Sequence, residues 1–231
     1  MIWALIENKK VEANPNSKGI CPICNGKVFS KCGEINVWHW AHNNDENCDK
    51  WYEPESFWHK HWKMTFGKDI AEIRIEKDGK FHIADIRTAD DIVIELQNSN
   101  ISKPIIRQRE IFYGERMVWL INGERFKKSL TVNDFWEDKE YLELISLPRI
   151  PVRWKRDNPE ITKGENDEFF KWINPRRSWI DVQRPLFIDF GEESLFKVIE
   201  GMGTSQIRGK YISKKKFIDK YGGDYQYYCQ K

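Results

Sequence analysis

The first quarter of the chain gathers side chains whose types and spacing suit a metal ion. Cys21 and Cys24 enclose Pro-Ile, and this two-residue gap lets both thiolates of a tight turn reach one tetrahedral ion. His39 and His42 follow with the same gap, and Cys48 lies just downstream, so five groups compete for four positions. In order of preference, the candidate ligands are Cys21, Cys24, His42, His39, Cys48 and, as a weaker sixth, Cys32.

This cluster predicts zinc, because thiolate and imidazole are ligands that zinc prefers. Four protein ligands leave no open position for water, so we expect one structural zinc per chain and no catalysis at this ion. The alternative is that the thiols are reduced core side chains and that the histidines belong to an aromatic cluster. Disulfide bonds are not expected of these cysteines in a cytosolic protein.

Two acidic side chains further along lie in apolar surroundings. Asp85 ends the run His-Ile-Ala-Asp, and Glu95 is followed two positions later by Gln97. Residues two apart on a strand share a face, and a neighbouring antiparallel strand can place Asp85 beside Glu95 and Gln97. An unpaired buried carboxylate is costly, so we expect a hard divalent cation here, magnesium or manganese. Such an ion polarises a phosphate oxygen and lowers the pKa of an attacking water.

A polar stripe precedes these strands. Glu55, His59 and Lys63 recur at steps of four, beside an apolar stripe that contains Trp58 and Trp62. This pattern indicates an amphipathic helix whose polar face could point toward Asp85 and Glu95. The alternative is a solvated ladder of ion pairs.

Regular elements must bring these groups together, and the residue pattern predicts them. Pro near the start and Gly at the end bound a helix at 53–67, and Ser-Lys-Pro begins a second helix. In order, we expect a helix at 53–67, strands at 70–76, 81–88 and 91–98, a helix at 104–115 and a strand at 116–123.

The flanking segments carry weaker patterns. Residues 2–20 predict a hairpin that supports the Cys/His cluster. After residue 124 we expect a helix near 133–145, a basic strand from 149, a loop at 157–168, strands at 184–191 and 194–200, and a short capped helix at 210–223 that stops at Gly222-Gly223.

Composition bounds the location of the protein and its class. The chain has 231 residues, 40% of them hydrophobic, and a net charge of +2. No apolar run approaches the ~20 residues that span a bilayer, and the first ten residues lack the layout of a secretory signal. We therefore expect a cytoplasmic protein without a membrane partner. Acids and bases nearly cancel, so overall charge neither supports nor excludes a polyanionic ligand.

The motifs together resemble the competence protein CoiA-like family and, at the level of fold, the PD-(D/E)xK nuclease superfamily. The motifs that carry the resemblance are CPIC, HWAH, ESFWH with Lys63, Ala84-Asp85 and ELQNSNIS, over roughly residues 20–121. The resemblance implies an α+β fold with a restriction-endonuclease-like core of helix, three-strand meander, helix and strand. We expect a hairpin and zinc-finger-like module at 1–50, this core at 51–123, and a C-terminal extension at 124–231.

The resemblance also assigns roles to individual residues. Asp85 and Glu95 would hold magnesium or manganese, Glu55 would be a further ligand or an orienting group, and Gln97 takes the usual lysine position. Glutamine cannot deliver a positive charge, although it can orient a water, so Lys63 or His59 would have to compensate. The expected catalytic residues are Glu55, His59, Asp85, Glu95 and Gln97, and the expected DNA contacts are Lys63, Arg109 and Tyr113, the last two matching an Arg-x-x-x-Tyr motif.

The function implied is hydrolysis of DNA phosphodiester bonds in DNA uptake, recombination or processing, with DNA and recombination or DNA-processing proteins as partners. The main alternative is a noncatalytic adaptor that binds DNA for recombination proteins through the zinc module, basic helices and tryptophans. A third hypothesis makes the tail from about residue 125 a surface for partner proteins.

Overall fold

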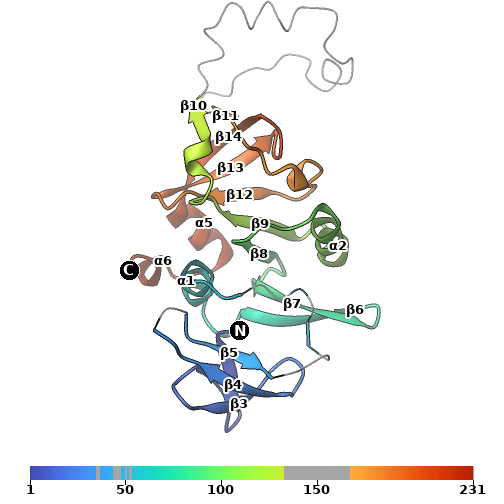
Figure 1. Ribbon diagram of the computed structural model, residues 1–231, viewed down its shortest axis with the longest axis vertical. Coiled ribbons are helices and arrows are strands. Elements are labelled where there is room, and N and C mark those ends of the chain that lie inside the picture. Colours follow the sequence, from blue (N-terminus) through green and yellow to red (C-terminus); the bar gives the residue numbers. More distant parts are fainter. Residues whose placement is uncertain (35–36, 44–47, 50, 52–53, 133–166, 231) are drawn as a thin grey trace, which may run out of the picture.

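The computed structural model describes residues 1–34, 37–43, 48–49, 51, 54–132 and 167–230, which form an α+β protein with two sheets (Figure 1). The smaller sheet, at the N-terminal end, has the order β2-β1-β3-β4-β5. Its strands are β1 (Trp3–Ile6), β2 (Lys9–Glu12), β3 (Lys18–Ile20), β4 (Lys27–Lys31) and β5 (His39–His42). The hairpin expected at 2–20 is present as β1 and β2.

The larger sheet is mixed and has the order β10-β11-β14-β13-β12-β9-β8-β7-β6. Strands β8, β9 and β12 run parallel to one another, and the remaining neighbours are antiparallel. Its strands are β6 (Ala71–Lys77), β7 (Lys80–Arg87), β8 (Val93–Gln97), β9 (Met117–Asn122), β10 (Leu130–Val132), β11 (Glu168–Trp172), β12 (Leu186–Asp189), β13 (Ser194–Glu200) and β14 (Gln206–Ser213). This sheet runs across the boundary expected at 123/124, because β12 pairs directly with β9.

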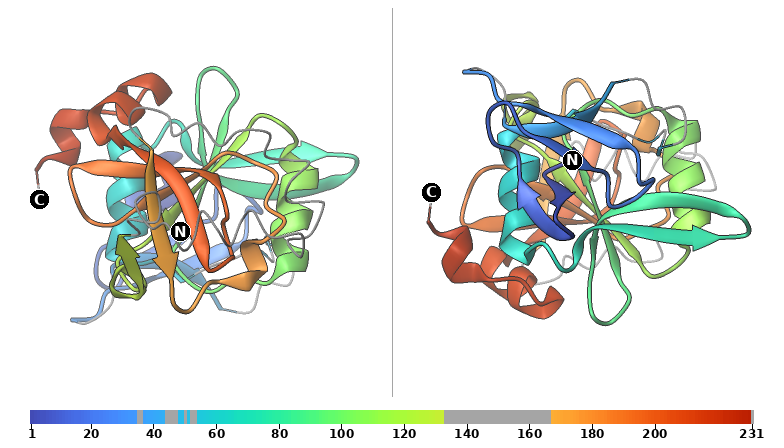
Figure 2. Two further views of the ribbon diagram at one scale, coloured as in Figure 1. Left: turned by 90° about the horizontal axis from the view of Figure 1, so that it is seen from above. Right: turned by 90° about the horizontal axis from the view of Figure 1, so that it is seen from below.

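Helices cover both faces of the larger sheet. Figures 1 and 2 show α1 (Phe57–Phe66) and α5 (Lys214–Tyr221) on one side and α2 (Lys103–Tyr113) on the other, with the short α6 (Tyr225–Tyr228) beside α1. Trp62 of α1 and Phe217 of α5 pack on the first face, and Ile106 of α2 packs on the second. Burial of apolar surface on both faces holds the site elements in place.

Helix α1 begins later than the sequence pattern predicts. The Ser56 hydroxyl accepts a hydrogen bond from the His59 amide and caps the helix, so Glu55 lies just outside it. Gly67 ends the helix with φ of 81°, a left-handed value that favours glycine. The order helix, three strands, helix, strand at 57–122 is otherwise confirmed.

The C-terminal pattern is confirmed in part. Strands β12 and β13 fall where they are expected, and α5 ends at Gly222. The predicted start of the last helix at residue 210 is wrong, because residues 210–213 continue strand β14, which pairs with β13. The helix near 133–145, the basic strand from 149 and most of the loop at 157–168 lie outside the described residues. Among the described residues, no helix combines the length and apolar character needed to cross a membrane.

Candidate metal centre and carboxylate cavity

Four side chains of the N-terminal module converge on one point. The ligand atoms of Cys21, Cys24, His42 and Cys48 all lie within 4.8 Å of one another. Cys24 Sγ and His42 Nε2 are 3.2 Å apart. A turn between β3 and β4 presents the first two thiols, since the Cys21 amide bonds to the Gly26 carbonyl over 2.8 Å. Three sulfur ligands and one imidazole fit a structural zinc ion.

Cys48 takes the place expected of His39. His39 and His42 both belong to β5, and residues three apart on a strand point to opposite faces. The two side chains would lie on one face of a helix, but on this strand they point apart. His39 Nδ1 lies 2.7 Å from the Val37 carbonyl instead. The geometry therefore reverses the expected order of His39 and Cys48, and Cys32 also lies outside the group.

Contacts within this group shift the pKa values of two of its thiols in opposite directions. The hydrogen bond from Cys48 lowers the pKa of Cys21 to about 5, against the opposing effect of burial. The same hydrogen bond, together with burial, raises the pKa of Cys48. Zinc binds the thiolate form, so the lowered pKa of Cys21 favours metal binding at this group.

Asp85 and Glu95 meet where β7 and β8 separate. The two strands pair at Ile86–Ile94 and Arg87–Val93. Beyond these pairs, side-chain carboxylates replace the partner strand as acceptors for the backbone amides. The Leu96 amide donates to Asp85 Oδ2 over 2.9 Å, and the Asp85 amide donates to Glu95 Oε1 over 3.4 Å. The adjacency that the sequence predicts for these two carboxylates is therefore present.

Lys63 reaches the same point from α1. Its Nζ lies 2.7 Å from Glu55, 3.2 Å from Glu72 and 3.1 Å from Asp85. The Lys63 and Glu55 side chains are only 6% and 4% exposed. Burial alone would raise the pKa of Glu55, but the charge of Lys63 outweighs it and lowers this pKa to about 2. Burial alone would lower the pKa of Lys63. The charges of the surrounding carboxylates outweigh this effect and raise the pKa of Lys63 well above its ordinary value.

Glu95 is paired on its other side with Arg109 of α2. Arg109 Nη1 lies 2.9 Å from Glu95 Oε2, and Nη2 donates to the Trp51 carbonyl over 2.8 Å. Burial raises the pKa of Glu95 to about 8; Asp85 adds to the increase and Arg109 opposes it. Glu95 can therefore exchange a proton near neutral pH.

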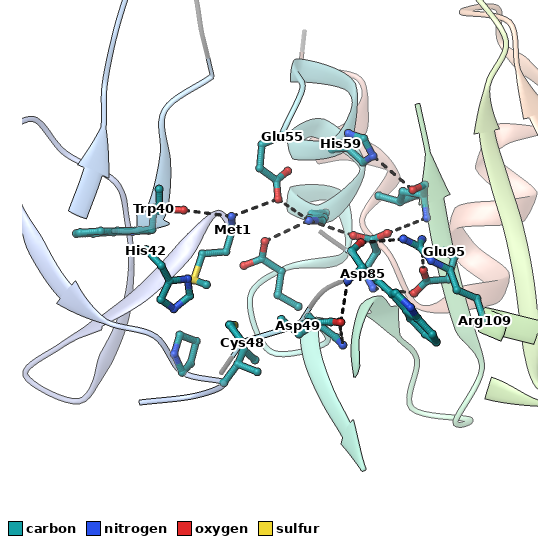
Figure 3. A pocket seen from close by; sticks show the side chains of 18 residues that line it. Met1, Trp40, His42, Cys48, Asp49, Glu55, His59, Asp85, Glu95 and Arg109 are labelled. Carbon is teal, nitrogen blue, oxygen red and sulfur yellow. Dashed lines mark hydrogen bonds and ion pairs between the residues drawn. The ribbon is translucent and has the colours of Figure 1, made fainter. Parts of the chain in front are cut away.

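These groups line one cavity of about 320 Å³ between the two sheets (Figure 3). Its walls come from the N-terminal module, including His42 and Cys48, and from the core, including Glu55, Asp85 and Glu95. The candidate metal centre and the carboxylates therefore face a shared space.

The other predicted site residues divide between the cavity and its surroundings. His59 lines the cavity, with Nδ1 2.9 Å from Ser56 Oγ and Nε2 3.4 Å from the Leu96 carbonyl. Gln97 is buried in β8, its amide donates to the Ser99 carbonyl, and it is not among the cavity-lining residues. Arg109 lines the cavity and is buried, and the Tyr113 hydroxyl is buried outside the lining residues, so DNA contact through either side chain stays a prediction.

The structure adds three residues that the sequence pattern does not reveal. Glu72 accepts hydrogen bonds from the Ile2 and Trp3 amides as well as from Lys63, and so ties β1 to the site. Asp49 and Trp51 line the cavity beside Cys48. Asp49 directly follows a candidate ligand, and this position was the one available signal.

The acidic groups fit a hard cation only as a pair. Within the described part of the chain, the Cys/His cluster is the one group of three or more side chains placed to hold a metal, so Glu55 does not complete a three-carboxylate site with Asp85 and Glu95. Two adjacent carboxylates nevertheless match the donors of magnesium or manganese, which often bind through one or two carboxylates and keep several waters.

Comparison with known proteins concerns the N-terminal module. Residues 5–50 match the family model of the competence protein CoiA, N-terminal domain. This range contains all four residues of the Cys/His group and ends before Glu55. No curated protein and no solved structure matches the chain.

Proposed function

We propose that this chain, whose residues 5–50 match the CoiA N-terminal domain, is a CoiA-like protein and a metal-dependent nuclease that hydrolyses DNA. Its core would be of the restriction-endonuclease-like, PD-(D/E)xK type, and its zinc would be structural. The proposed setting is cytoplasmic DNA processing in competence, with recombination or DNA-processing proteins as partners.

One observation supports this proposal above the others: Asp85, Glu95 and the Lys63 ammonium lie together at one end of a cavity. Two carboxylates and a fixed cation are the groups that phosphodiester hydrolysis needs, since charge develops on the phosphate oxygens in the transition state. Magnesium or manganese bound by Asp85 and Glu95 would supply Lewis acidity and a water of lowered pKa.

The residues of the chain have separable roles in this proposal. Lys63 supplies the positive charge that Gln97 cannot, because its ammonium is 3.1 Å from Asp85. Glu55 and Glu72, whose carboxylate oxygens lie 2.7 and 3.2 Å from that ammonium, hold it in place. Glu95 would hold the ion together with Asp85, and the Arg109 guanidinium, 2.9 Å from Glu95 Oε2, keeps this carboxylate in place.

The test is cleavage of labelled single-stranded and duplex DNA by zinc-loaded full-length protein, with magnesium, manganese or chelator. We expect metal-dependent cleavage that Asp85→Asn lowers by about 100- to 1000-fold, because the substitution removes a charged ligand while keeping the side-chain volume. Rates under single-turnover conditions measure the effect.

Asp90→Asn is the matched control, since Asp90 is exposed in the turn between the same two strands. It should cleave at the wild-type rate. Undiminished cleavage by Asp85→Asn would rule out this site, and absence of cleavage by the wild-type protein on every substrate would rule out the nuclease.

One observation favours a noncatalytic DNA-binding adaptor as the second candidate. Each oxygen of Asp85 and Glu95 already faces an N–H group or a cation: Leu96, Lys63, Arg109 or the Asp85 amide. A cation must compete with these partners. The adaptor predicts that the same DNA strands are retained in a gel without turnover in any metal.

A further inference from the structure

The segment after Cys48 is tied to the core by Asp49. The Asp49 side chain is 6% exposed, and its Oδ2 accepts a hydrogen bond from the Ile83 amide over 2.7 Å. Its Oδ1 accepts from the Trp51 amide over 3.0 Å and lies 2.8 Å from His82 Nδ1. Asp49, which directly follows the candidate zinc ligand Cys48, therefore holds β7 at Ile83, two positions before Asp85.

Trp51 makes the second connection. Its carbonyl accepts from Arg109 Nη2 over 2.8 Å, and the other arm of Arg109 holds Glu95 over 2.9 Å. Its ring stacks on His82, with centroids 3.2 Å apart. Trp51 is thus connected to the second carboxylate, Glu95, through Arg109.

We propose that Asp49 and Trp51 are positioning residues that couple the metal centre at Cys48 to the carboxylate cavity. Metal ligation fixes Cys48, and Asp49 and Trp51 transmit this restraint to β7 and to Arg109. Coupling between two sites is reciprocal, so an intact Asp49 contact must also strengthen metal binding. The proposal concerns the site of the proposed nuclease, but its structural part can be measured without any cleavage.

The experiment is amide hydrogen exchange at Ile83 in the zinc-loaded full chain. Asp49→Ala removes the acceptor of this amide, so exchange at Ile83 should accelerate about tenfold, with Asp49→Asn closer to wild type because it keeps one oxygen. Asp90→Ala should leave exchange unchanged, and the amide of Leu120 in β9 reports whether the core stays folded.

Zinc affinity is the second measurement. Competition with a chelator should show about tenfold weaker zinc binding in Asp49→Ala, whereas Asp90→Ala binds as wild type. Where cleavage is present, Asp49→Ala should lower kcat and leave KM unchanged, since Asp49 positions the β7 segment that carries Asp85 and does not touch substrate.

Wild-type exchange at Ile83 together with wild-type zinc affinity in Asp49→Ala would overturn the coupling. If Asp49→Ala shows both faster exchange at Ile83 and weaker zinc binding but the wild-type protein cleaves no DNA, the coupling is supported and the nuclease function is ruled out. Faster exchange at Ile83 with unchanged zinc affinity would also overturn it, because Asp49 would then be a local contact only.

Discussion

Replacement of Lys63 by methionine is expected to lower the free energy of unfolding by about 3–5 kcal/mol, because it removes the cation that the buried carboxylates Glu55 and Glu72 share. Glu55 and Glu72 both contact the Lys63 ammonium, and Asp85 is within 3.1 Å of it. Methionine keeps most of the volume, so the loss reports charge and not a cavity. Urea unfolding followed by tryptophan fluorescence measures it.

Lys60→Met on the same helix is the matched control. Lys60 pairs with Glu12 at the surface, where removal of a pair costs about 0–1 kcal/mol. Equal losses in the two variants would contradict the buried network.

The pH dependence of the Lys63→Met effect gives a second check. The folded pKa of Glu55 is about 2, below its ordinary value, so its contribution to stability is present above about pH 4.5 and is lost as pH falls through 2. The difference between wild type and Lys63→Met should therefore be full at pH 7 and shrink toward pH 2. A difference independent of pH would mean that Lys63 acts through packing.

Replacement of Cys48 by alanine is expected to abolish stoichiometric zinc binding, whereas replacement of His39 by alanine should leave one zinc per chain. Of these two residues, only Cys48 belongs to the group of four candidate ligands. Structural zinc contributes on the order of 10 kcal/mol to the folding of small modules, so Cys48→Ala should also expose residues 1–50 to protease. Metal analysis of purified protein and limited proteolysis are the measurements.

His39→Ala serves as the control because His39 lies on the same strand as His42 but on its other face. Retention of zinc by Cys48→Ala with loss in His39→Ala would restore the order expected from the sequence. Loss in both variants would point to unfolding of β5, which circular dichroism separates from loss of a ligand.

Local patterns in the sequence predicted much of the fold. Alternation and helical periodicity placed α1, β6, β7, β8, α2 and β9 within a few residues, because each buries an apolar face. The register of a hairpin follows from its turn, so the adjacency of Asp85 and Glu95 could be predicted.

Contacts between distant segments could not be predicted in this way. Glu72 binds the amides of Ile2 and Trp3, which are far away in sequence, and nothing in a strand pattern signals such a partner. The choice of Cys48 over His39 depended on β5 being a strand, because the same spacing on a helix would have brought His39 and His42 together. The pairing of β12 with β9 likewise joins segments separated by residues 123–185.

The most direct test of the account is anomalous diffraction from crystals of zinc-loaded protein soaked in manganese. We predict a zinc peak among Cys21, Cys24, His42 and Cys48 and a separate manganese peak about 2.1 Å from carboxylate oxygens of Asp85 and Glu95, beside Lys63. A zinc peak with no manganese at these carboxylates, under soaking that labels other acidic sites, would contradict the proposed hydrolytic centre.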